Sequence, residues 1–234
     1  MSLLSSSLFA IVWLGLCLGW PGVVLAARET TPAQQAGVDA AVLAYESGRL
    51  REARRRLAPL AAQGVPAAQF NLAVMHLRGE IVPADVRLAR RLLERSAGGG
   101  FVTAMVALGQ ALEAGQFGKR NLPASHHWYL LAARAGSVHA MVGVATAFYL
   151  GRGADKDAAQ AAHWYREAAK GGDVGAQYLL ASMFEQGDGV ARDLRLARYW
   201  YDIAARNGDE AGPAKVRELD ARLAVQDTAA TTPP

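Results

Sequence analysis

Residues 179–208 read LLASMFEQGDGVARDLRLARYWYDIAARNG, and this stretch indicates the fold of the chain. An apolar run with helical spacing ends at a glycine-containing loop, and a second helical run, beginning near Asp193, ends at Gly208. Upstream, residues 148–172 read FYLGRGADKDAAQAAHWYREAAKGG and have the same loop and second run 36 residues earlier. Self-similarity at a fixed period is the signature of a protein built from stacked repeats.

Several sets of equivalent positions keep this 36-residue step without an insertion or deletion. The glycines that end the units are Gly64, Gly100, Gly136, Gly172 and Gly208. Small residues recur at Ala68, Ala104, Ala140 and Ala176, and larger apolar ones at Leu72, Leu108, Val144 and Leu180. Aromatic pairs recur as Trp128-Tyr129, Trp164-Tyr165 and Trp200-Tyr201. Small residues allow helices to approach closely, and we expect the aromatic pairs to fill the wider gaps between units.

Each unit reads as two helices. In the first unit, the first helix is predicted over about residues 66–78 and ends at Gly79, since glycine readily adopts the left-handed conformation past a helix end. The second helix is predicted to begin after Asp85 and to stop at Gly100. Asp85 and its equivalents Asn121, Asp157 and Asp193 suit an N-cap, because their side-chain oxygens accept hydrogen bonds from free backbone N–H groups.

This pattern resembles the Sel-one-like repeat family, which is related to the tetratricopeptide repeats. The resemblance is close over residues 64–208 and looser back to Val38, where AYESGRLREARRRLAPLAAQG (residues 44–64) is similar to a tetratricopeptide-type hairpin. It implies an all-α fold, an α-solenoid of antiparallel helix hairpins with about four 36-residue repeats. The first repeat lacks the Trp-Tyr pair, and the second has GQFGKRN in place of the usual loop.

The chain divides into four segments. We interpret residues 1–26 as a signal peptide cleaved near Ala26, because a short apolar run precedes small residues at the −3 and −1 positions. Residues 27–37 are expected to be a flexible linker, residues 38–224 the solenoid, and residues 225–234 a disordered tail. Residues 209–224 would form a charged C-terminal capping helix, with Arg217 at a position that is small in the repeats.

Export would place the mature protein in the bacterial periplasm or outside the cell. The alternative is an uncleaved N-terminal anchor, since Leu8–Ala26 nearly reaches the length that spans a membrane. Cys17 is the sole cysteine, so a chain cleaved near Ala26 has no disulfide, thiol nucleophile or thiolate metal site.

The net charge of +4 lies in the N-terminal part of the chain, because basic and acidic residues are equal in number from Phe101 onward. The basic excess includes Arg49, Arg51, Arg54, Arg55 and Arg56. It has two interpretations: weak contact with an anionic surface, or an ordinary solvated helix face.

Nothing in the sequence assembles a catalytic, metal or cofactor site, so we do not expect an enzyme. His127 and His163 occupy equivalent positions, but neighbouring helices lie about 10 Å apart and zinc ligands need bonds of about 2 Å. The tryptophan positions could suit a stacking platform for sugars or bases, yet their step matches that of the packing positions. We therefore interpret them as core.

By resemblance to tetratricopeptide repeats, the first helices line the concave side of the solenoid. The predicted partner-binding residues there are Phe70, Val74, Gln110, Glu113, Val142, Thr146, Tyr149, Tyr178, Ser182 and Glu185. This mixture of apolar and hydrogen-bonding groups suits a peptide or protein partner better than nucleic acid or another polyanion. The alternative is that these side chains merely pack against adjacent helices.

The sequence thus predicts an exported protein–protein interaction scaffold, an adaptor or regulator of the bacterial envelope that binds its partner in the concave groove. Two alternatives remain: a secreted factor that binds a host or competitor protein, and a hydrolase acting on the cell wall. Fold alone does not decide among them.

Overall fold

The structure, a computed structural model, describes residues 30–231; the predicted signal peptide lies outside the described residues. Within this range the chain forms eleven α-helices and no strand, which confirms the predicted all-α class. The helices are α1 (Pro32–Glu46), α2 (Leu50–Ala62), α3 (Pro66–Leu77), α4 (Val86–Gly98), α5 (Val102–Ala114), α6 (Leu122–Arg134), α7 (Val138–Leu150), α8 (Ala158–Lys170), α9 (Val174–Gln186), α10 (Leu194–Arg206) and α11 (Gly212–Thr231). None of these helices between residues 30 and 231 combines the length and apolarity needed to cross a membrane.

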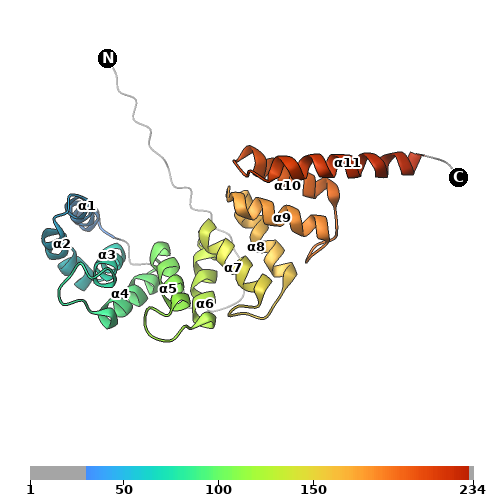
Figure 1. Cartoon of the computed structure of the whole chain (residues 1–234). Coiled ribbons are helices and arrows are strands. Elements are labelled where there is room, and N and C mark those ends of the chain that lie inside the picture. The colour runs from blue at the N-terminus through green and yellow to red at the C-terminus, as the bar shows by residue number, and fades with distance from the viewer. Residues whose placement is uncertain (1–29, 232–234) are drawn as a thin grey trace, which may run out of the picture.

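Consecutive helices pack as hairpins, α1 with α2 through α9 with α10, and each hairpin packs against the next. The hairpins follow one another along an arc that begins at α1 and ends at α11 (Figure 1). The main contacts are therefore between helices that are neighbours in the chain, as expected of a solenoid whose units bury their apolar faces by stacking. The predicted solenoid is confirmed.

The second helices of the four repeats begin at the predicted N-caps. The Asp85 side chain accepts a hydrogen bond of 2.8 Å from the Leu88 backbone N–H, and the side chains of Asn121, Asp157 and Asp193 accept the equivalent bonds. Each bond satisfies a backbone donor that has no partner within the helix. The starts of α4, α6, α8 and α10 are therefore encoded locally.

Two loop glycines set how closely successive hairpins approach. Gly189 follows α9 with a φ of +68°, and a Cβ atom there would lie 2.1 Å from the carbonyl oxygen of Ala158 at the start of α8. Gly153 makes the equivalent approach to Leu122 at the start of α6. Both positions require glycine because of the left-handed backbone and because no side-chain atom fits.

The core consists largely of alanine and leucine at the repeated positions. The small residues Ala68, Ala104, Ala140 and Ala176 are fully buried, as are Leu108, Val144 and Leu180. These residues belong to three apolar clusters that follow one another along the array. Small side chains at these points let the helices pack closely, as the repeat pattern predicted.

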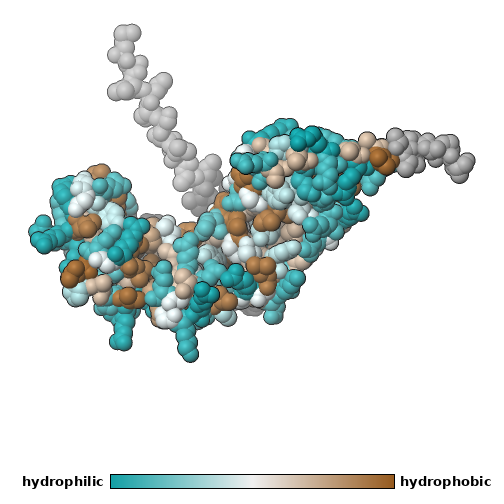
Figure 2. All heavy atoms as spheres, viewed as in Figure 1, coloured by the Kyte–Doolittle hydropathy of each residue, from teal (hydrophilic) through white to brown (hydrophobic). Residues whose placement is uncertain are grey.

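Both ends of the solenoid extend further than the sequence indicated. Helix α1 begins at Pro32, inside the segment expected to be a linker, because Thr31 and Gln34 form a capping box ahead of it. Helix α11 continues to Thr231, beyond residue 224. Arg217 and Asp220 on α11 are exposed, and its surface is largely hydrophilic in Figure 2. A polar helix of this kind covers the last repeat, which otherwise would expose its apolar face.

Candidate partner-binding groove

Three adjoining cavities lie along the first helices of the hairpins. The N-terminal cavity, of about 320 Å³, lies among α1, α2 and α3, and the middle cavity, of about 530 Å³, lies among α3, α4 and α5. Both are lined by Val74 and Arg78. The Glu113 cavity, of about 190 Å³, lies among α5, α6 and α7. Gln110 of the middle cavity is 3.1 Å from the His139 side chain of the Glu113 cavity, so the three hollows follow one another along the array.

Six of the ten predicted partner-binding residues line these cavities. They are Phe70 and Val74 in the N-terminal cavity, Gln110 in the middle cavity, and Glu113, Val142 and Thr146 in the Glu113 cavity. The alternative, that these side chains pack against adjacent helices, also holds in part. Phe70 is half-buried, and the centre of its ring lies 5.5 Å from that of the Phe101 ring. The structure thus brings these residues to one surface, and their binding of a partner stays a prediction.

The other four predicted residues lie towards the C-terminal end and contact groups of the chain itself. They are Tyr149, Tyr178, Ser182 and Glu185. Tyr149 hydrogen-bonds with Asp188, which raises the pKa of the tyrosine. Tyr178 packs edge-on against Tyr201, with ring centres 4.9 Å apart. Ser182 accepts a 3.1 Å hydrogen bond from Gln186.

Glu185 has the most extensive set of partners, all within the chain. Its side chain is 12% exposed and accepts hydrogen bonds from Tyr201 at 3.0 Å and from Arg222 of α11 at 2.6 Å. The Lys215 ammonium of α11 lies 3.4 Å away. Burial raises the pKa of Glu185, but the bonds from Arg222 and Tyr201 and the charge of Lys215 outweigh it, so the pKa lies below its usual value. In this conformation Glu185 joins α9 to α11, and a role in binding would require α11 to move.

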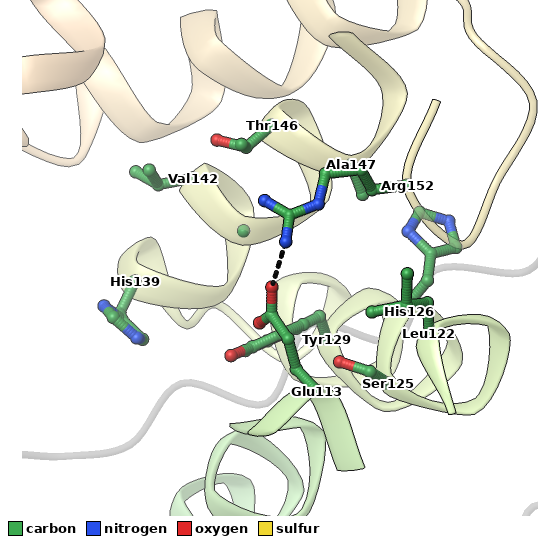
Figure 3. A pocket seen from close by; sticks show the side chains of 11 residues that line it. Glu113, Leu122, Ser125, His126, Tyr129, His139, Val142, Thr146, Ala147 and Arg152 are labelled. Carbon is green, nitrogen blue, oxygen red and sulfur yellow. Dashed lines mark ion pairs between the residues drawn. The ribbon is translucent and has the colours of Figure 1, made fainter. Parts of the chain in front are cut away.

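Glu113 occupies the equivalent position two repeats earlier and faces the Glu113 cavity. Tyr129 lies beside it and hydrogen-bonds with it (Figure 3). Burial, together with the Glu113 charge, raises the pKa of Tyr129 to about 12, so the phenol stays protonated at neutral pH. Arg152 reaches Glu113 from the loop after α7 at 3.7 Å, and the two side chains are 49% and 41% exposed. An exposed pair at this distance contributes little to stability.

The repeat pattern does not reveal the role of the tyrosine hydroxyls. Tyr129, Tyr165 and Tyr201 are predicted to fill the gaps between hairpins, and their rings are buried. Their hydroxyls, however, reach the first-helix side: Tyr165 lies 3.0 Å from the Thr146 hydroxyl, and the other two bond with the glutamates. The available signal was a polar residue 16 or 19 positions before each tyrosine in an otherwise apolar pattern.

The histidines and tryptophans singled out in the sequence lie in ordinary surroundings. His127 and His163 are exposed, and each ring meets its neighbouring tryptophan edge-on. Trp128, Trp164 and Trp200 are half-buried and pack against the apolar clusters, as the interpretation as core predicted. Between residues 30 and 231, no three His, Cys, Asp or Glu side chains gather closely enough to hold a metal ion.

The N-terminal arginines are partly paired. Arg49 and Arg56 bind Glu52 at 3.0 and 2.8 Å, and the hydrogen bond from Arg56 lowers the pKa of that carboxyl group. The side chains of Arg54 and Arg55 are exposed on α2. Contact of this face with an anionic surface stays a prediction.

Comparison with protein families identifies the repeats. The model of the Sel1 repeat matches residues 66–101, 102–137, 138–173 and 174–209, which together make up more than half of the chain. The chain belongs to the Sel1 repeat family. The matched boundaries follow the hairpins, so each Sel1 repeat is one hairpin of α3 to α10 with its loops. Sel1 repeat proteins generally mediate protein–protein interaction and are typically scaffolds without enzymatic activity.

Solved structures support the family and the fold. A protective antigen present in uropathogenic Escherichia coli strains, with an SLR fold, is 26% identical, with a TM-score of 0.72 over 78% of this chain. A Sel1 repeat protein from Oxalobacter formigenes is also 26% identical, with a TM-score of 0.72 over 77% of this chain. The chain spans 40% of the first protein and 74% of the second.

A more distant likeness concerns the fold alone. The pilF protein of Pseudomonas aeruginosa is 14% identical, with a TM-score of 0.53 over 85% of this chain and 92% of its own. A search of curated proteins gave no match.

Proposed function

We propose that this Sel1 repeat protein is an exported scaffold, an adaptor or regulator of the bacterial envelope, that binds a peptide or protein partner along its first-helix groove. The observation that carries the proposal is the succession of three adjoining cavities, lined by six of the residues predicted from the repeat pattern. A row of cavities from α1 to α7 suits an extended or helical segment better than a small compact ligand.

The chemistry of the groove supports a polypeptide partner. Phe70 and Val74 offer apolar contact at one end, while Gln110, His139 and Glu113 offer hydrogen-bonding groups further along. Interfaces combine an apolar centre with oriented polar groups in this way, because burial supplies affinity and hydrogen bonds supply specificity. Among the described residues, the cavity linings are mixed in character, with Arg78 and Arg152 beside Glu46 and Glu113, whereas a polyanion is favoured by a surface of one charge sign.

Site-specific photo-crosslinking tests where the partner binds. Crosslinkers at Val74, Gln110 and Val142 probe the groove, and crosslinkers at the exposed positions Arg91, Gln160 and Tyr199 of the second helices serve as matched controls. In envelope extracts of the native organism, the groove positions should capture the same partner and the control positions should not. Capture from the second helices alone would refute the groove as the binding surface.

Export rests on the predicted signal peptide. Mass spectrometry of the protein purified from the native envelope should show a chain that begins at Ala27. A full-length chain in the membrane fraction would instead support the uncleaved anchor, and a full-length chain in the cytoplasm would contradict export.

A further inference from the structure

Helix α11 occupies the place of a first helix in the register of the repeats. Gly212 and Leu219 are buried, and each lies 36 residues after a buried residue of α9, Ala176 and Met183. Helix α11 packs on α10 as α7 packs on α6. The C-terminal junction of α9, α10 and α11 can therefore be compared, position by position, with the central junction of α5, α6 and α7, which precedes it by 72 residues.

At the C-terminal junction a lysine lies between a carboxylate and an aromatic ring. The Lys215 ammonium is 3.4 Å from Glu185 and 5.9 Å from the centre of the Tyr201 ring. Tyr201 in turn donates its hydroxyl hydrogen to Glu185. A cation is stabilised in such a position both by the carboxylate charge and by the electron-rich face of the ring.

The central junction has the same carboxylate and the same ring but lacks the lysine. Glu113 and Tyr129 lie 72 residues before Glu185 and Tyr201, and the residue 72 positions before Lys215 is Gly143. A Cβ atom at Gly143 would lie 3.4 Å from the Tyr129 ring, in ordinary van der Waals contact. In the register of the repeats, the Glu113 cavity, which Gly143 lines, thus corresponds to the place where the lysine side chain lies in the other junction.

The junction between these two, formed by α7, α8 and α9, shows what replaces the ionic pair when both charges are absent. The position of the glutamate holds Tyr149, and the position of the lysine holds Leu179. The hydroxyl of the buried tyrosine, Tyr165, has the Thr146 hydroxyl as its partner instead of a carboxylate. The central junction therefore keeps the carboxylate and the ring of the arrangement without the lysine of the next first helix.

Two further side chains at the Glu113 cavity help to define which ligand the cavity can bind. Arg152 approaches Glu113 at 3.7 Å from a loop and is 49% exposed, so the chain supplies a cation that a ligand could displace. His126 also lines the cavity, and its Nδ1 atom is buried with no hydrogen-bond partner among the described residues. Burial lowers the pKa of His126, which favours the neutral ring with one nitrogen free to accept a hydrogen bond.

We propose that the Glu113 cavity binds the cationic side chain of a lysine or arginine in the partner polypeptide. The ammonium or guanidinium group would lie against Glu113 and the face of Tyr129, in the position that corresponds to that of the Lys215 ammonium at the C-terminal junction. It would displace Arg152. This inference rests on the proposed function, because it names one anchor of the segment that occupies the groove.

An NMR titration of the mature chain tests the cavity directly. The probes are N-acetyl-lysine methylamide and N-acetyl-arginine methylamide, with N-acetyl-norleucine methylamide as the uncharged counterpart and spermidine as a free polyamine. We expect a saturable shift of the Gly143 amide signal with a cationic amino-acid probe and none with norleucine. Tighter binding of spermidine than of both amino-acid probes would overturn the assignment to a polypeptide side chain, as would equal shifts with norleucine or no saturation.

Variants separate the cavity from the rest of the groove. Glu113→Gln should weaken binding of the cationic probe by about tenfold or more, and Arg152→Ala should tighten it. Gly143→Lys should abolish it, because the new lysine fills the cavity as Lys215 does at the C-terminal junction. Glu210→Gln, a control at an exposed glutamate outside the three cavities, should leave the Gly143 titration unchanged. Binding that is the same in the wild type and in Glu113→Gln would refute the proposal.

The outcome also distinguishes this inference from the proposed function. If the crosslinked partner binds the Gly143→Lys variant as tightly as the wild type, and that variant unfolds cooperatively, the cavity is not an anchor but the groove stands. If crosslinks form from the second helices alone, the groove is not the partner-binding surface, whatever the result of the NMR titration.

Discussion

The Tyr201 hydroxyl donates a 3.0 Å hydrogen bond to the Glu185 carboxylate and so joins α10 to α9 at the end of the solenoid. Both side chains are largely withdrawn from water, and Arg222 and Lys215 of α11 reach the same carboxylate. The capping helix is therefore held by a partly buried ionic cluster as well as by apolar contact. A cluster of this kind is stable while every member keeps its partners.

Removing the Tyr201 hydroxyl should loosen this cluster. We expect Tyr201→Phe to lower the free energy of unfolding by about 1–2 kcal/mol, since the bond is made to a charged acceptor. Urea unfolding followed by circular dichroism measures the change. Tyr199→Phe, at a side chain of the same helix that is 53% exposed, should change stability by less than about 0.5 kcal/mol. Equal effects of the two substitutions would contradict the role given to Tyr201.

The stability of the cap should depend on pH through Glu185. Its pKa in the folded protein lies below the ordinary value of 4.5, so the unfolded chain binds the proton more readily. The stabilisation from Glu185 is therefore complete above pH 4.5 and is lost as the pH falls through the folded-state pKa. Unfolding of the wild type and of Glu185→Gln should differ at pH 7 and converge in acid; a difference that grows in acid would contradict the sign.

Leu219 should carry much of the apolar attachment of α11. It is fully buried, so Leu219→Ala should cost about 2–4 kcal/mol through lost burial and the cavity left behind. The comparison is Leu196→Ala on α10, where the leucine is 41% exposed and the loss should be clearly smaller. Thermal unfolding of both variants measures the difference. A Leu219→Ala variant as stable as Leu196→Ala would show that α11 is not packed as described.

Substitutions at Gly189 and Gly48 distinguish the stability cost of steric crowding from the cost of backbone strain. Both have a left-handed φ, +68° and +74°, but a Cβ atom at Gly48 would meet nothing within 4 Å. Gly48→Ala should therefore cost about 1–2 kcal/mol from the backbone alone. Gly189→Ala should cost clearly more, because the loop must move off the start of α8. Similar losses in the two variants, measured by urea unfolding, would mean that the loop is not held against that helix.

Arg152 should contribute almost nothing to folding. Its ion pair with Glu113 spans 3.7 Å between side chains that are 49% and 41% exposed to solvent, so Arg152→Ala should change the free energy of unfolding by less than about 0.5 kcal/mol. A variant destabilised as strongly as Tyr201→Phe would show that Arg152 is a structural residue rather than a displaceable cation.

Much of the fold could be predicted from local signals. The 36-residue step placed every hairpin of the repeats, and the Asp85 set marked the starts of the second helices because an N-cap acts within three residues of itself. The ends were less predictable. The capping box at Thr31 begins a helix where composition suggested a linker. Helix α11 continues to Thr231, beyond the predicted end of the capping helix at residue 224.

The sequence by itself determined the units, their register and the line of first-helix residues that could form a groove, since each of these follows from periodic burial. The tertiary structure decided how those residues are used. Glu113 and Glu185 are equivalent in sequence, yet one faces a cavity and the other is bound by α11. The difference arises from the side chain that the next helix brings against each carboxylate. Gly143 leaves Glu113 to Tyr129 and to Arg152 of a loop, whereas Lys215 and Arg222 hold Glu185 against α11.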